Sequence, residues 1–148
     1  MSLVDRFLAL FQRGFYPRTH TPAFALEAMR NATIGGWIMV AIHFLTGAVI
    51  LIHLSGDPRV TSGDWLIPAT IQLFFALIYG GLATANWKGS RVAAVTILIF
   101  VLFDMFVVMS RVDGFDLQAI IQFVPLLLAV GGVRGAFAYA QFVKSGEA

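Results

Sequence analysis

The chain contains no cysteine and few charged residues, and each shortage excludes a class of protein. Without cysteine there can be no disulfide, no thiolate metal site and no iron–sulfur cluster. Charged residues make up 12% of the 148 residues, whereas hydrophobic residues make up 59%. A water-soluble domain of this size could not cover so much apolar surface with so few charges. The composition therefore predicts a protein that folds in lipid.

Sequence motifs for catalysis and for nucleic-acid binding are also lacking. The chain has no phosphate-binding P-loop, no dinucleotide fingerprint and no acidic cluster with the spacing of a metal site. Its basic residues are not interleaved with aromatic residues as they are in nucleic-acid-binding proteins. His43 and His53 are ten residues apart in one predicted helix, so they cannot clamp one haem together. We therefore expect no enzymatic activity, no cofactor, no metal and no nucleic-acid partner.

Four apolar runs are long enough to cross the hydrocarbon core of a bilayer, which is about 30 Å thick and requires about 20 helical residues. They cover residues 32–54, 65–87, 91–111 and 117–140. Because the connections are short, consecutive helices should be antiparallel neighbours. Backbone hydrogen bonding in lipid restricts spanning segments to helices or closed barrels. We predict an all-α membrane protein, an up-down bundle of four transmembrane helices.

The segment 1–31 precedes the predicted four-helix domain, which covers 32–140. Apolar residues recur at helical spacing from Leu3 to Phe15, with charged residues on the other side. This pattern favours an amphipathic helix lying in the membrane interface. A secretory signal peptide is excluded because charges interrupt the apolar stretch. A threonine–proline pair at 21–22 has the character of a cap and a first-turn proline, so a helix should begin there and continue into the first span.

Lysine and arginine are distributed unequally between the two sides of the predicted bundle. Eight of the ten basic residues lie in the N-terminal segment, in the second connection or at the C-terminal end, and only Arg59 and Arg111 lie on the opposite side. Basic residues concentrate in the cytoplasmic loops of membrane proteins. We therefore expect both termini, including a short tail at 141–148, on the cytoplasmic side of a membrane of the bacterial inner-membrane type.

Asp104 is a carboxylate in the middle of the third span, with no other ionisable residue near it in sequence. A charge at the centre of a bilayer costs roughly 2.5 kcal/mol or more, so such an acid requires a partner or a proton. A helical rise of about 1.5 Å per residue places His43, Gln72, Asp104 and Gln122 roughly 16–23 Å from the inner edge of their spans. Because a lone polar side chain has no partner in lipid, we predict that these residues form one intramembrane polar layer.

Small residues accompany the predicted layer and indicate which helix faces pack together. The candidate packing glycines are Gly36, Gly47, Gly80, Gly131 and Gly135. Small residues let membrane helices approach closely, and the last two have the GxxxG spacing that also occurs in helix dimers. Two further polar residues are weaker candidates for the layer. Gln118 shares a helix face with Gln122, and Arg111 follows Asp104 by two turns but is better explained as a side chain that extends to the outer surface.

Two functional hypotheses remain open at this point. In the first, the chain is a small non-catalytic integral membrane protein, an accessory or assembly subunit that packs against other membrane proteins or against copies of itself. The polar layer then fixes the register of the helices. In the second, the chain is a small oligomeric proton-coupled transporter or carrier, in which Asp104 titrates and His43 modulates it. The short connections between the helices and the absence of catalytic motifs favour the first hypothesis. The ionisable residues Asp104 and His43 motivate the second.

Overall fold

A computed structural model describes residues 17–55, 61–110 and 117–146, with the side chains of residues 54, 55 and 117–120 left undescribed. Within these ranges the chain forms four helices and no strand: α2 (Pro22–Ser55), α3 (Ser62–Trp87), α4 (Arg91–Met109) and α5 (Leu117–Ser145). Each helix is long and apolar enough to cross a membrane. The predicted all-α bundle of four membrane spans is therefore confirmed. The interfacial helix expected within the first sixteen residues lies outside the described residues.

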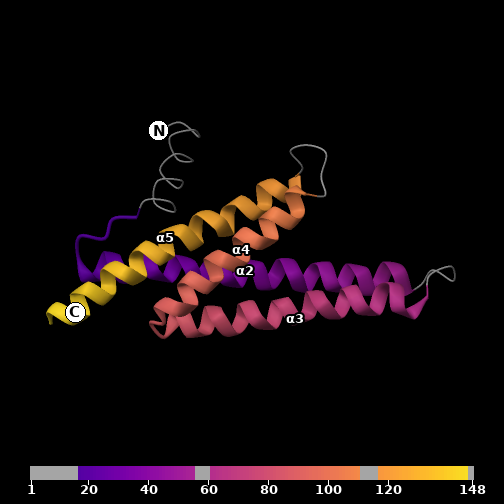
Figure 1. Ribbon diagram of the computed structural model, residues 1–148, viewed down its shortest axis with the longest axis horizontal. Helices are drawn as coiled ribbons and strands as arrows, with labels where there is room; N and C mark the ends of the chain where they lie inside the picture. The colour runs from indigo at the N-terminus through magenta and orange to yellow at the C-terminus, as the bar shows by residue number, and fades with distance from the viewer. Residues whose placement is uncertain (1–16, 56–60, 111–116, 147–148) are drawn as a thin grey trace.

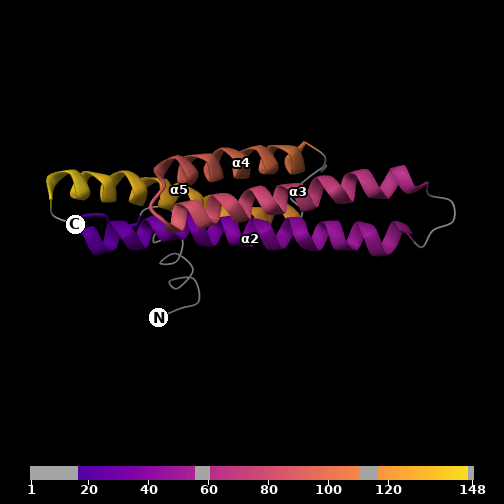
Figure 2. The ribbon, with the colours of Figure 1, turned by 90° about the horizontal axis from the view of Figure 1, so that it is seen from below.

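The helices alternate in direction and form two antiparallel pairs that cross obliquely (Figure 1). α2 and α3 lie side by side along most of their length, and α2 also packs closely against α5. α4 packs mainly against α5 and makes smaller contacts with α3 and α2. Figure 2 shows α4 on the side of the bundle opposite to α2. α2 therefore makes the two most extensive interfaces of the bundle, one with α3 and one with α5.

Local sequence signals fix where the helices begin. The backbone N–H of Phe24 donates to Thr21 Oγ1 at 3.3 Å, so the predicted cap ahead of Pro22 is present and α2 starts there. At the tight turn between α3 and α4, Gly89 has a φ of 95°, a conformation that glycine adopts without steric cost. Ser90 then caps α4 by accepting a hydrogen bond from the backbone of Ala93 at 3.2 Å. These signals explain why three residues suffice to reverse the chain.

Glycines allow α2 to approach both of its neighbours. A Cβ atom on Gly132 would overlap Ala32, and one on Gly135 would overlap the backbone of α2 at Ala28 and Met29. The backbones of α2 and α5 are thus in direct contact, as small residues permit in membrane helices. Gly135, one residue of the GxxxG spacing, is buried against α2 of the same chain, and Gly131 is buried as well.

The other candidate glycines line the interface between α2 and α3. A Cβ on Gly36 would lie 3.0 Å from the Cβ of Ala83, and one on Gly47 would lie 3.3 Å from the Cβ of Gln72. Gly80 is less crowded, because a Cβ there would make ordinary contact with Val40 at 3.7 Å. The pair Gly35 and Gly36 does not interrupt α2, which is one continuous helix of 34 residues. The two glycines instead face α5 and α3, respectively.

Candidate functional site

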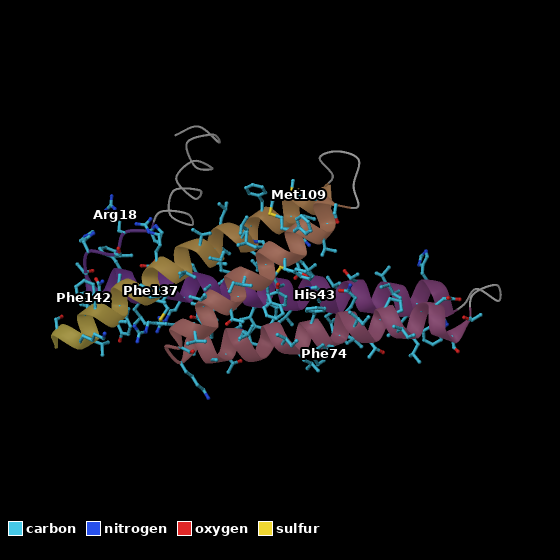
Figure 3. All side chains as sticks on the ribbon, in the orientation of Figure 1. Arg18, His43, Phe74, Met109, Phe137 and Phe142 are labelled. Carbon is cyan, nitrogen blue, oxygen red and sulfur yellow. The ribbon has the colours of Figure 1, made fainter. Side chains whose placement is uncertain are left out.

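His43 is buried in α2, and its two ring nitrogens contact two different helices. Its Nδ1 lies 2.6 Å from Gln72 Oε1 on α3, and its Nε2 lies 3.0 Å from Asp104 Oδ2 on α4. Gln72 Oε1 can only accept a hydrogen bond, so Nδ1 carries the hydrogen in this contact. Figure 3 shows His43 in the central part of the bundle. Three of the four residues of the predicted polar layer therefore lie together.

Asp104 has a second partner that the sequence did not suggest. The hydroxyl of Tyr79, in α3, donates to Asp104 Oδ2 at 2.6 Å. Tyr79 is completely buried, and the side chains of His43 and Asp104 are 9% and 13% exposed. We call His43, Gln72, Tyr79 and Asp104 the His43 cluster. It joins α2, α3 and α4 through side chains alone.

The hydrogen bonds of the His43 cluster restrict where its protons lie. With Nδ1 committed as a donor to Gln72, the contact between Nε2 and Asp104 Oδ2 requires one proton between them. That proton gives either an imidazolium beside a carboxylate or a neutral imidazole beside a carboxylic acid. Both arrangements hold the same number of protons and have no net charge. A neutral cluster avoids the cost of an unpaired charge in the membrane interior.

Aromatic rings enclose the His43 cluster. The imidazole stacks on Phe75, with ring centroids 5.5 Å apart, and on Tyr79, with centroids 5.4 Å apart. Phe100 of α4 meets both of these rings edge-on, at 6.2 Å and 6.0 Å. Edge-on and offset-stacked arrangements are favourable for aromatic pairs. The rings separate the polar atoms from lipid and attach α4 to α3, whose direct contacts are otherwise limited.

The sequence of α3 explains how its polar residues reach α2. Gln72, Ala76, Tyr79, Ala83 and Asn86 follow one another at intervals of four and three residues, so they share one face of the helix. Along this face the small residues Ala76 and Ala83 are buried. Opposite Gln72, α2 has Gly47, which leaves room for the helices to approach until Gln72 reaches His43.

Gln122, the fourth residue of the predicted layer, is buried in α5 but does not join the cluster. Its exposed fraction is 4%, and its Oε1 has no hydrogen-bond partner within the described residues. Tyr79 takes the place that the depth comparison assigned to Gln122. The two weaker candidates cannot be placed, since the side chain of Gln118 is undescribed and Arg111 lies outside the described residues.

A second buried polar contact links α2 and α3 nearer the turn between α3 and α4. Asn86 is fully buried, and its Nδ2 donates to the carbonyl of Met29 at 3.0 Å and to Thr33 Oγ1 at 2.8 Å. This contact was not predicted from the sequence because Asn86 lies at the end of its span. Its distance of fourteen residues from Gln72, which is two heptads, was the available signal.

The described residues contain no group of three or more His, Cys, Asp or Glu side chains that could hold a metal ion. Comparisons with protein-family models, with curated proteins and with solved structures give no match to this chain. What the protein does must therefore be inferred from its fold and from the His43 cluster. Chemically, the cluster can hold three helices in one register, and it can move one proton between His43 and Asp104 without a change in net charge.

Proposed function

We propose that the chain is a small non-catalytic subunit of a larger membrane assembly. The observation that carries this proposal is that the strongest polar groups within the spans bind one another. Both ring nitrogens of His43 and the Oδ2 atom of Asp104 are engaged by neighbouring helices. A cluster in this state stabilises the bundle and leaves its outer faces for contacts with partners.

The surface of the bundle supports a membrane partner over a soluble one. The turn between α3 and α4 is only a few residues long, so it offers little surface to a soluble protein. Large apolar side chains cover the outer faces of the helices, and Phe74, Leu77 and Phe106 are 60%, 76% and 71% exposed. Figure 3 shows Phe74 directed away from the other helices. Such faces contact either lipid or another transmembrane helix.

The test is purification from its native membrane in a mild detergent, with an affinity tag at the C-terminus. The proposal expects a stoichiometric complex with at least one other integral membrane protein. A matched preparation in a harsh detergent should release the chain from that complex. Recovery of the chain as a single, partnerless species from the mild detergent would contradict the proposal.

A second candidate function is proton-coupled transport, and the ionisable pair His43–Asp104 at mid-span is the observation that favours it. Ionisable residues inside membrane proteins commonly belong to ion or proton pathways. The pair supplies one proton that either residue can hold. The test is the variant Asp104→Asn in proteoliposomes with a pH-sensitive dye inside. Unchanged proton flux in a folded variant would eliminate this candidate, whereas abolished flux would favour it over the structural role.

We also propose that both termini lie on the cytoplasmic side, as the distribution of Lys and Arg suggests. The chain has no native cysteine, so the labelling of a single introduced cysteine shows on which side of the membrane that residue lies. Ser145→Cys, at the end of α5, should react with a membrane-impermeant maleimide only after cells are opened. Ser110→Cys, at the end of α4, should react in intact cells with a permeable outer envelope. The reverse pattern would show the opposite orientation.

A further inference from the structure

Three basic residues lie near Trp87, in contact or in sequence, at the end of the bundle that holds the turn between α3 and α4. The guanidinium carbon of Arg30, in α2, lies 4.7 Å from the centroid of the Trp87 ring. Lys88 follows Trp87 directly, and Arg91 is the first residue of α4. All four side chains are exposed. A cation held over an indole face is a favourable arrangement, and it fixes Arg30 beside the turn.

Backbone and side-chain contacts hold this group of residues in place. Asn86 Nδ2 donates to the carbonyl of Met29 at 3.0 Å, which holds α2 and α3 together beside the contact between Arg30 and Trp87. The turn is closed by a hydrogen bond from the backbone of Gly89 to the carbonyl of Asn86 at 2.9 Å. Lys88 therefore cannot move far from Trp87. The fold therefore fixes the backbone positions of the residues in the basic group.

No acid of the described chain forms an ion pair with the basic side chains of this group. The one ion pair found in residues 17–55, 61–110 and 117–146 joins His43 to Asp104, so none of the three basic side chains takes part in one. The first turn of α4 contains no acidic residue, and helix N-termini carry a partial positive charge of their own. Arg91 adds a full positive charge at that position. Glu27, one turn before Arg30 in α2, is the nearest acid in sequence and forms no ion pair with it, so the three basic side chains remain open to an external anion.

An apolar strip leads from the basic group toward the membrane interior. Ile34 and Trp37 follow Arg30 by four and seven residues, so the three side chains share one face of α2. Ile34 is 51% exposed and Trp37 is 52% exposed. If the anion bound at Arg30 carries an acyl chain, that chain can pack against the exposed side chains of Ile34 and Trp37. A free inorganic anion would gain nothing from the strip.

We propose that Arg30, Lys88 and Arg91 bind the phosphate of an anionic phospholipid, with Trp87 at the level of the headgroup. Basic groups beside membrane spans bind anionic headgroups, and tryptophan is enriched at that depth. The acyl chain of the lipid lies along Ile34 and Trp37. The site is independent of the proposed assembly role, because it requires only the bundle itself.

The test uses quenching of Trp87 fluorescence by brominated lipid. The chain contains three tryptophans, so the double variant Trp37→Phe, Trp65→Phe retains Trp87 alone and keeps the strip apolar. This protein is reconstituted into phosphatidylcholine bilayers that contain a small fraction of brominated phosphatidylglycerol or, in parallel, brominated phosphatidylcholine. We expect stronger quenching by the anionic lipid. Equal quenching by the two lipids in this folded parent protein would overturn the proposal without recourse to any further variant.

Charge variants of the exposed side chains locate the site. Lys88→Gln and Arg91→Gln should each weaken the preference for the anionic lipid by roughly fivefold, and the combination should nearly abolish it. Lys144→Gln removes an exposed charge from the last turn of α5, a helix that contributes no residue to the basic group, and should leave the preference unchanged. A preference that survives the double substitution, or that falls equally with Lys144→Gln, would contradict a specific site.

Inorganic phosphate distinguishes the two sources of the anion. Sodium chloride should weaken the preference for phosphatidylglycerol by screening, and sodium phosphate at equal ionic strength should weaken it to the same extent. If phosphate reduces the preference further than chloride does, the basic group binds a free anion and the assignment to a lipid is wrong.

Discussion

His43 Nε2 and Asp104 Oδ2 lie 3.0 Å apart, although 61 residues separate them in the chain. The pair joins α2 to α4, two helices that make few other contacts. It also gives a carboxylate in the middle of an apolar helix the partner that the membrane interior demands. The pair is supported on both sides, by Gln72 at the other ring nitrogen and by Tyr79 at the same carboxylate oxygen.

Removal of both members of this pair should destabilise the bundle by less than the sum of the two single removals. We expect His43→Leu and Asp104→Leu each to lower the free energy of unfolding by about 1–3 kcal/mol, because each leaves a buried polar partner without its hydrogen bond. The double variant should fall short of the sum by about 0.6–1.7 kcal/mol, the average and the upper value for hydrogen bonds between membrane helices. Reversible unfolding in mixed detergent micelles measures all four proteins. Strict additivity would contradict a direct interaction.

Tyr79 should contribute through its hydroxyl. Tyr79→Phe keeps the ring contacts but removes the donor to Asp104, so we expect a loss of about 0.6–1.7 kcal/mol in the free energy of unfolding. Tyr139→Phe is the matched control, since the Tyr139 hydroxyl has no hydrogen bond within the described residues. The same micelle unfolding experiment compares the two. An equal effect of both substitutions would show that the hydrogen bond from Tyr79 to Asp104 does not contribute to the free energy of unfolding.

The two buried glutamines should respond differently to replacement by leucine. Gln72→Leu removes the partner of His43 Nδ1 and should lower stability by about 1–3 kcal/mol, because a buried donor loses its acceptor. Gln122→Leu replaces an amide whose Oε1 has no partner in the described residues, so it should be neutral or stabilising. Thermal unfolding in detergent gives the comparison. Marked destabilisation by Gln122→Leu would place Gln122 among the bonded groups after all.

The contact between α2 and α5 should be sensitive to a single methyl group. Gly132→Ala would force the new Cβ into Ala32, so we expect a loss of about 1–3 kcal/mol from overpacking. Gly81→Ala is the control, because no atom lies within 4 Å of a Cβ built there. Helix propensity favours alanine, so that variant should be at least as stable as the parent protein. If Gly132→Ala were tolerated as well as Gly81→Ala, the close approach of the two helices would be wrong.

The fold was predictable because hydrophobic length and charge are properties of local sequence. The predicted spans agree with the four helices to within a few residues, except where α2 starts earlier, at the predicted cap, and α5 continues to Ser145. The depth of a residue in the membrane also follows from counting along a helix. For this reason the layer position of His43, Gln72 and Asp104 could be anticipated from sequence.

The direction of a side chain around its helix was harder to predict, because it depends on which neighbours the helix packs against. α3 and α5 pack against different faces of α2, with Gly36 facing α3 and Gly35 facing α5, so glutamines at the same depth in the two helices approach α2 from different directions. Gln122 thus has the expected burial but not the expected bonds. Tyr79 was not predicted to belong to the cluster because an aromatic ring is an ordinary residue in an apolar helix, so its hydroxyl group did not stand out. The periodic face that it shares with Gln72 and Asn86 carried the missing information.

The order of the helices along the chain places the hydrogen-bond partners of Asp104 before it in the sequence. α2 and α3 leave the ribosome first, and they already contain His43, Gln72 and Tyr79. Asp104 of α4, which is synthesised later, forms its hydrogen bonds with His43 of α2 and Tyr79 of α3. In the folded bundle Asp104 therefore does not bear the penalty of about 2.5–3.5 kcal/mol for an isolated charged residue at mid-bilayer. The hairpin of α2 and α3 thus contains the binding partners for the ionisable residue of the helix that follows it, α4.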